Sequence, residues 1–271
     1  MRREIAVGEN GDKTQCGGRK RRGFNCNLRG VVKPSIPQIT FMKATAIALG
    51  LLMLTTYIAQ TEREAIQFAI SLNARPISTL TNGKITTWTT GIDGGGKGDG
   101  YLTLSAALFN GDKTPHALPD DPLIPANAEH PAIKLHYDNA DDKNNQAYNM
   151  SGIDSVKFNF RDRKYKNVYL ALTSSEGPSD ISVTFGHKFS PSVTKNFVVP
   201  DYYEDIKSGN SDFCYLVHDL AKWGPKNNMI EKDHHNIDLL KIDVSHQTYI
   251  RSITIKKGKR GYLVLWAAAA D

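Results

Sequence analysis

The sequence predicts an all-β fold for residues 61–271, an antiparallel two-sheet β-sandwich of the jelly-roll class. Apolar and polar residues alternate with period two in several segments, which is typical of strands with one face on a core. Turn sequences separate these segments. After Glu64, no stretch longer than about ten residues shows apolar residues at helical spacing, so the long helices that connect parallel strands are not expected.

The clearest strands lie in the second half of the chain. Alternation predicts strands at 155–160 and 181–185, and the segment 168–173 between them is apolar on both faces, as in the centre of a sheet. Further strands are expected at 67–72, 85–89, 101–104, 132–137, 194–199, 213–217, 239–244, 250–255 and 262–267. Residues 215–223 also allow a short helix. Asparagine, glycine and proline favour chain reversals at Asn82-Gly83, Asn110-Gly111, 174–178 and 258–261.

An apolar leader precedes this domain. Residues 44–61 carry no charged side chain and follow Lys43 directly. The most apolar part, 46–54, has the length of a signal-peptide core and is shorter than the roughly 20 residues that a membrane span needs. We therefore predict a signal peptide at 42–60 and a secreted, extracellular protein. An uncleaved N-terminal membrane anchor is the main alternative, because Tyr57 in Tyr57-Ile58-Ala59 is bulky where a cleavage site needs a small residue, and a buried helix is a further one.

The first 41 residues are basic and glycine-rich, above all at 17–23, and show no apolar periodicity. We expect a disordered extension that is absent from a cleaved mature protein. Residues 1–60 hold ten Lys and Arg against three Asp and Glu, which leaves 24 basic and 25 acidic residues in 61–271. A nucleic-acid partner is therefore not expected, and the basic segments 161–166 and 256–260 are interpreted as hairpin tips. Membrane contact is expected only through an uncleaved leader.

Cysteine usage supports the same division. Cys16 and Cys26 lie before the leader, so a processed chain keeps only Cys214 and has no intramolecular disulfide. Cys214 stands in an apolar run, where a buried structural thiol is expected.

Three consecutive segments resemble a block found in galactose-binding-like β-sandwich domains of secreted, carbohydrate-associated proteins. They are Ser-Val-Lys-Phe-Asn-Phe at 155–160, Lys-Tyr-Lys-Asn-Val-Tyr-Leu-Ala-Leu-Thr at 164–173 and Ser-Asp-Ile-Ser-Val-Thr-Phe at 179–185. The segments 239–244, 250–255 and 262–267 resemble the closing strands of that family, and the glycine-rich stretch 92–101 resembles the one before the block. The likeness covers roughly residues 150–270. The chain departs from the family at Tyr202, where relatives often have Trp, and has no room for an attached glycosidase domain.

The resemblance implies a secreted, lectin-like protein that binds carbohydrate without catalysis. Sugar binding needs aromatic faces to stack on the ring and polar side chains to bond its hydroxyls. The candidates are Trp88, Tyr101, Asp201, Tyr202, Tyr203, Trp223 and Asn227. For each aromatic residue the alternative is an anchor that holds its loop on the core.

Two metal hypotheses follow from the carboxylates and histidines. Asp93 and Asp99 flank the glycine loop and supply oxygen ligands for calcium, and sandwiches of the resembled family often hold a structural calcium. The loop lacks the spacing of a phosphate-binding loop. Asp233-His234-His235 and His218-Asp219 form a metal or acid/base site if the fold brings them together, although no spacing requires it.

The sequence thus favours a binding protein over an enzyme. A secreted polysaccharide hydrolase of sandwich fold is one alternative, and an extracellular adhesion or structural protein is the other. Asn149-Met150-Ser151 is a glycosylation sequon if the source is a eukaryote.

Overall fold

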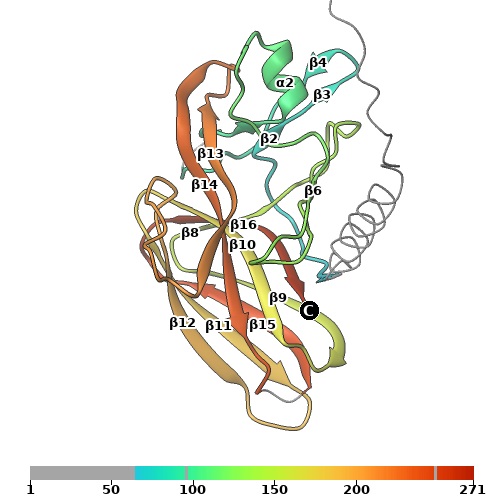
Figure 1. Cartoon of the computed structure of the whole chain (residues 1–271), viewed down its shortest axis with the longest axis vertical. Helices are drawn as coiled ribbons and strands as arrows, with labels where there is room; N and C mark the ends of the chain where they lie inside the picture. The colour runs from blue at the N-terminus through green and yellow to red at the C-terminus, as the bar shows by residue number, and fades with distance from the viewer. Residues whose placement is uncertain (1–64, 95–96, 247–248) are drawn as a thin grey trace, which may run out of the picture. The chain divides into compact units, whose positions relative to one another are not determined.

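The computed structural model describes residues 65–94, 97–246 and 249–271, all within one structural unit of the chain, Gln60–Asp271. These residues form antiparallel β-sheets with very little helix, so the predicted all-β class is confirmed (Figure 1). The predicted extension at 1–41 and the predicted signal peptide at 42–60 lie outside the described residues. Among the described helices, none has the length and apolar character that crossing a membrane requires.

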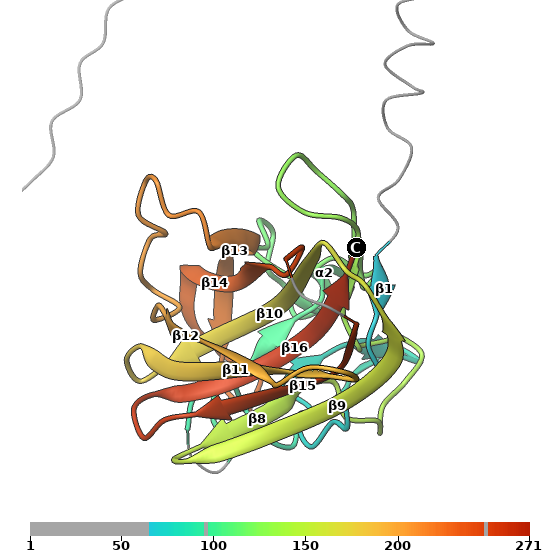
Figure 2. The same cartoon turned by 90° about the horizontal axis from the view of Figure 1, so that it is seen from below.

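Two large sheets make up the fold, and Figure 2 shows their strands from below. The six-stranded sheet has the order β1 (Ile66–Gln67), β16 (Tyr262–Ala270), β10 (Asn167–Ser175), β14 (Met229–Asp243) and β13 (Phe213–Trp223), with β8 (Tyr148–Ser151) also pairing with β16. The four-stranded sheet has the order β12 (Val193–Val199), β11 (Ser179–His187), β15 (Ile250–Lys257) and β9 (Asp154–Arg163). All pairings within both sheets are antiparallel.

The main core joins the two sheets. Ile181, Val183 and Phe185 of β11 are buried in it, while the residues between them reach solvent, as the period-two pattern predicts. Strand β10 is buried along its whole length. Val168 and the residues two and four positions further on enter the main core, whereas Tyr169 faces a second core on the other side of the sheet. The prediction of a central strand at 168–173 is therefore confirmed.

Residues 65–147 supply much of the second core, which covers the outer face of the six-stranded sheet. This layer contains the short strands β2 (Ile77–Ser78), β3 (Leu80–Thr81), β4 (Lys84–Ile85), β5 (Tyr101–Leu102), β6 (Leu123–Ile124) and β7 (Ile133–Lys134), and the helix α2 (Leu104–Phe109). Tyr101 stacks on Trp266 of β16, with ring centroids 5.9 Å apart. A smaller third cluster holds Trp88 and Trp223 against α2.

The structure corrects several predicted elements. The strands expected at 67–72, 85–89 and 132–137 are reduced to two-residue strands at Ile66–Gln67, Lys84–Ile85 and Ile133–Lys134, and the one at 101–104 ends at Leu102. The helix considered for 215–223 is wrong, because these residues belong to strand β13. Its ladder to β14 contains repeated register shifts, and such β-bulges break the period-two pattern by which a strand is recognised.

The basic segments end in turns, since 164–166 connects β9 to β10 and 258–261 connects β15 to β16. Their interpretation as hairpin tips is wrong, because each turn leads from the four-stranded sheet to the six-stranded sheet and the strands it joins do not pair. Cys214 is half-buried, and burial raises the pKa of its thiol to about 11. The thiol therefore stays protonated and inert at neutral pH.

Candidate functional site

A polar groove lies where the loop after β12 meets the β13–β14 hairpin. It has a volume of about 260 Å³. We call it the Tyr203 groove, and it is lined by Tyr203, Asp205, Tyr215, His218, Asp219, His234 and Asn236. Aromatic rings therefore stand beside carboxylate, amide and imidazole groups in one depression, which is the composition that recognition of a polar ligand with an apolar ring face requires.

Two β-bulges aim side chains of the hairpin at this groove. Asp219 in β13 and His234 in β14 have φ angles of 62° and 75°, in the left-handed region that non-glycine residues rarely adopt. The backbone N–H of His234 donates a hydrogen bond to Asp219 Oδ1 at 3.2 Å, and the N–H of Asp219 donates to Asn236 Oδ1 at 3.2 Å. Positions of this kind each cost about 1 kcal/mol or more, and they are often found at functional sites.

Four neighbouring polar residues hold Tyr203 in the groove: Tyr202, Lys222, Glu231 and His235. We call these four residues, together with Tyr203, the Lys222 cluster. The Lys222 Nζ donates to Tyr202 Oη at 3.3 Å and to Tyr203 Oη at 3.1 Å, and it lies 3.1 Å from Glu231 Oε1. The Tyr203 hydroxyl donates to Glu231 Oε2. The Tyr203 ring rests against the rings of Tyr202 and His235, each with a centroid 4.5 Å away.

The electrostatics of the Lys222 cluster keep Lys222 and Glu231 charged. Burial alone would lower the pKa of Lys222, but hydrogen bonds with Tyr203 and Glu231 raise it above its ordinary value. The hydrogen bond from Tyr203 lowers the pKa of Glu231. Burial lowers the pKa of His235, while Glu231, whose Oε2 lies 3.4 Å from Nε2, opposes this shift; the Nδ1–H donates to the Leu220 carbonyl at 2.9 Å. The result is an ion pair that fixes a tyrosine ring at the groove wall.

Possible metal ligands gather on the same hairpin. The ligand atoms of Asp219, Asp233 and His234 all lie within 4.8 Å of one another. His234 Nδ1 lies 3.7 Å from Asp219 Oδ1 and 3.5 Å from Asp233 Oδ1. His116, from the loop after α2, brings its Nδ1 to 2.9 Å from Asp219 Oδ2. The structure thus brings Asp219 of one predicted histidine motif close to Asp233 and His234 of the other. His235 does not join them, because its ring packs against Tyr203 in the Lys222 cluster.

Most of the predicted aromatic candidates lie in the interior. Trp88 and Trp223 share the third hydrophobic cluster, and Tyr101 belongs to the second core; all three are 3% exposed or less. Tyr202 is buried beside Tyr203, which is 43% exposed. The buried rings therefore anchor loops on the core. Of the aromatic residues predicted to bind carbohydrate, Tyr203 is the one that remains exposed as a stacking platform.

The two polar candidates shape loops. Asp201 accepts hydrogen bonds from the backbone N–H groups of Gly177 at 2.7 Å and Tyr203 at 3.2 Å, so it positions the platform residue. Asn227 lies in the β13–β14 turn with a φ of 57°, and its carbonyl accepts a hydrogen bond from Asn110. It lines no part of the Tyr203 groove.

The predicted calcium ligands lie close together in space. Asp93 Oδ1 accepts a hydrogen bond from the Asp99 backbone N–H at 2.6 Å. Burial, followed by the nearby charge of Asp93, raises the pKa of Asp99, and Lys222 Nζ lies 3.9 Å from its Oδ2. The ammonium group already supplies positive charge at this position. Calcium binding at Asp93 and Asp99 stays a prediction.

The side chain of Asn149, in the predicted sequon, points inward. Its Nδ2 donates to the Gly91 carbonyl at 2.8 Å and to the Tyr262 hydroxyl at 2.7 Å, and the residue is buried. A glycan on Nδ2 would replace one of these hydrogen bonds, so the folded chain does not present this amide for modification.

Sequence reasoning did not single out Lys222, Glu231, Tyr215 or His116. Lys222 and Glu231 pair across the β13–β14 ladder, and a strand prediction continued through 213–223 would have found their hairpin. His116 contacts Asp219 across 103 positions in sequence, and no local pattern reports that contact.

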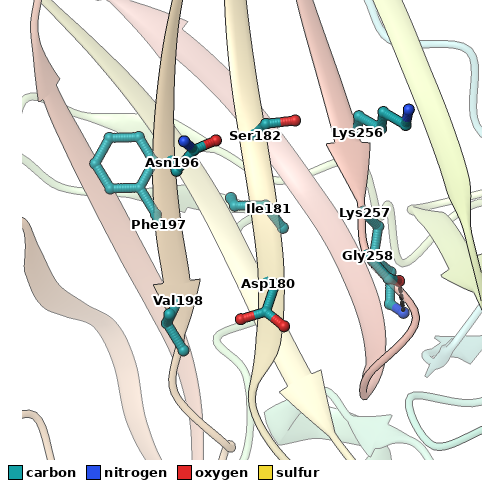
Figure 3. A pocket seen from close by; sticks show the side chains of 9 residues that line it. All are labelled: Asp180, Ile181, Ser182, Asn196, Phe197, Val198, Lys256, Lys257 and Gly258. Carbon is teal, nitrogen blue, oxygen red and sulfur yellow. Dashed lines mark hydrogen bonds between the residues drawn. The ribbon is translucent and has the colours of Figure 1, made fainter.

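A larger depression of about 450 Å³ lies on the four-stranded sheet (Figure 3). Asp180, Ser182, Asn196 and Lys256 contribute polar groups to it, and its sole aromatic lining residue, Phe197, packs against the main core. It therefore lacks the tyrosine ring and the histidines of the Tyr203 groove.

Comparison with known proteins adds no relative. No protein-family model matches the chain, and no curated protein matches it.

Proposed function

We propose that the chain is a secreted, non-catalytic carbohydrate-binding protein with a galactose-binding-like jelly-roll sandwich, and that the Tyr203 groove is its sugar site. The observation that carries this proposal is the exposed Tyr203 ring beside the side chains of Asp205, Asn236 and His218. A tyrosine face stacks on the apolar side of a pyranose, while carboxylate and amide groups bond its hydroxyls. Cell-wall, mucus or matrix glycans are the proposed targets.

Preorganisation supports the same site. The Tyr203 ring is fixed by the Lys222–Glu231 pair and by two neighbouring rings before any ligand arrives. A platform that is already ordered loses little conformational entropy on binding. The four-stranded sheet offers a larger depression but no equivalent ring.

The hydrolase alternative has one observation in its favour, which is the proximity of the Asp219 and Asp233 carboxylates. Glycosidases need one carboxyl group that is protonated at working pH, in addition to a second that is ionised. Hydrogen bonding from the His234 backbone lowers the pKa of Asp219. Asp219 is therefore suited to the ionised role and not to the role of the acid.

A glycan array probed with the full chain tests the proposal, followed by calorimetry on the best ligand. We expect Tyr203→Ala to weaken binding at least tenfold, because it removes the stacking ring, and Tyr203→Phe to weaken it less. Tyr249→Ala removes an equally exposed tyrosine, 45% exposed and outside the groove, and should leave affinity unchanged.

Other outcomes would redirect the assignment. An array without binding would count against a sugar site and favour an adhesion or structural role. Release of reducing sugar from a bound glycan would favour the hydrolase. Secretion is tested separately, since N-terminal sequencing of the exported protein should begin near Gln60, whereas an intact leader would indicate a membrane anchor.

A further inference from the structure

The arrangement of Asp219, Asp233 and His234 fits the first coordination shell of a small transition-metal ion. In a tetrahedral zinc site with ligand bonds of about 2.0–2.1 Å, neighbouring ligand atoms lie roughly 3.3–3.4 Å apart. His234 Nδ1 is already 3.5 Å from Asp233 Oδ1 and 3.7 Å from Asp219 Oδ1. The third separation, between the Asp219 and Asp233 carboxylate oxygens, is within 4.8 Å, so the two carboxylates would have to close on a bound ion, and their exposed side chains are free to do so.

The donor set separates this group from an ordinary acidic surface cluster. One imidazole nitrogen and two carboxylates suit zinc, copper or nickel, whereas calcium prefers six to eight oxygen ligands and magnesium retains most of its waters. Three protein ligands also leave one tetrahedral position open. Because Asp219 and His234 line the Tyr203 groove, a group in the groove could occupy that position.

Neighbouring residues hold the Asp219 carboxylate in place. His116 Nδ1 lies 2.9 Å from Asp219 Oδ2, and the His234 N–H reaches Oδ1. Hydrogen bonds of this kind orient metal ligands in known metal sites and are often worth 10- to 100-fold in affinity. The paired bulges bring Asp219 and His234 to the same point from two different strands.

We propose that Asp219, Asp233 and His234 bind one divalent transition-metal ion, with zinc as the best fit, and that His116 is a positioning residue for Asp219. The site is separate from the calcium predicted at Asp93 and Asp99. It does not depend on carbohydrate binding, because metal affinity can be measured without a glycan.

Calorimetric titration of the full chain with zinc chloride tests the proposal. All proteins should carry Cys16→Ser and Cys26→Ser, so that thiols outside the described residues do not bind the ion. We expect one saturable site and a higher Tm with zinc. Cobalt substitution should produce the visible absorption of tetrahedral coordination, which a loosely bound surface ion does not show.

Single substitutions distinguish the metal ligands from histidines that do not bind the ion. Asp233→Asn and His234→Ala should each weaken zinc binding at least tenfold, and His116→Ala should weaken it by a smaller factor. His246→Ala removes an exposed histidine outside the groove and should change nothing. The proposal is overturned if zinc does not saturate, or if His246→Ala loses as much affinity as His234→Ala. Asp233→Asn is nearly isosteric, so a matching Tm without metal establishes that a loss of binding is not a loss of folding.

Discussion

The two sheets treat ionisable side chains in opposite ways. The four-stranded sheet keeps one face open, and its ion pairs Asp180–Arg260 and Asp162–Lys188 lie at the surface. The central part of the six-stranded sheet is covered on both faces, and Lys222, His235 and Asp238 are buried in this sheet. Lys257 and His187 of the four-stranded sheet are exceptions. The buried ammonium of Lys257 donates to the carbonyls of Gly152 and Gly258 at 3.0 Å each.

This difference shows that burial of an ionisable side chain, more than its charge, determines whether it needs a protein partner in this fold. A covered group must find partners or change its protonation state, because desolvation disfavours the charged form. An open group is solvated whether or not it is paired. Substitutions on the covered sheet should therefore have large effects on stability and pH dependence, and matched substitutions on the open sheet should have small ones.

The largest effect is expected for Asp238→Asn. Asp238 is 1% exposed, and neither carboxylate oxygen has a hydrogen-bond partner among the described residues. Burial raises its pKa to about 8 from an ordinary value of 3.8. The unfolded chain releases this proton near pH 4 and the folded chain near pH 8, so the free energy of unfolding should fall as pH rises between these values.

Asparagine cannot ionise, so the variant should lose this slope. At pH 8 it should be more stable than the wild type by about 2–4 kcal/mol, less than the full pKa shift implies, because the buried amide also lacks partners. Urea unfolding at pH 5 and pH 8 measures both effects. Equal pH slopes in the two proteins would show that Asp238 is ionised or solvated in the folded state.

A smaller effect is expected for Lys222→Met. The side chain of Lys222 is 9% exposed, whereas that of its partner Glu231 is 41% exposed and can recover water. Removing the ammonium should therefore destabilise the fold by about 1–2 kcal/mol, below the 3–5 kcal/mol typical of a fully buried pair. It should also weaken the proposed sugar binding, because Tyr203 loses a hydrogen bond that holds its ring.

A double-mutant cycle with Glu231→Gln isolates the pair. Chemical denaturation of the two single variants and the double variant should give a coupling energy of about 0.5–1.5 kcal/mol. Additive effects would mean that the Lys222–Glu231 ion pair does not support the groove and that Lys222 acts through its other contacts.

The same contrast explains what could be predicted from the sequence. In the four-stranded sheet each strand has one solvated face, so the alternation of apolar and polar residues can be detected in the sequence at 155–160 and 181–185. Strand β10 was recognisable because residues 168–172 are apolar on both faces. The layer 65–147 was not recognisable, because its strands are two residues long and its apolar residues are buried by contacts with distant strands.

The residues of the candidate site can also be divided into those that the sequence indicates and those that only the fold brings together. Composition singled out the turn that holds Asp201, Tyr202 and Tyr203. Of these residues Tyr203 lines the groove, whereas Asp201 accepts a hydrogen bond from its backbone N–H and Tyr202 packs beside its ring. The contacts that complete the site depend on the bulges at Asp219 and His234. A bulge changes which face of the sheet each later residue of the strand points to. Burial of Trp88 and Trp223 confirms the alternative of loop anchors, whereas the helix that covers them gives too short a pattern to detect.

The smallest effect is expected for Arg260→Ala on the open sheet. Arg260 binds Asp180 in a two-pronged pair, with Nη2 at 2.7 Å from Oδ1 and Nε at 3.0 Å from Oδ2, which is better geometry than Lys222 has with Glu231. Both side chains are nevertheless more than half exposed, so water replaces the lost contact and the Tm should not change measurably. The hydrogen bond from Arg260 lowers the pKa of Asp180, and an NMR titration of the variant should show that pKa returning toward its ordinary value. A clear fall in Tm would mean that good geometry outweighs exposure, and the contrast between the two sheets would then fail.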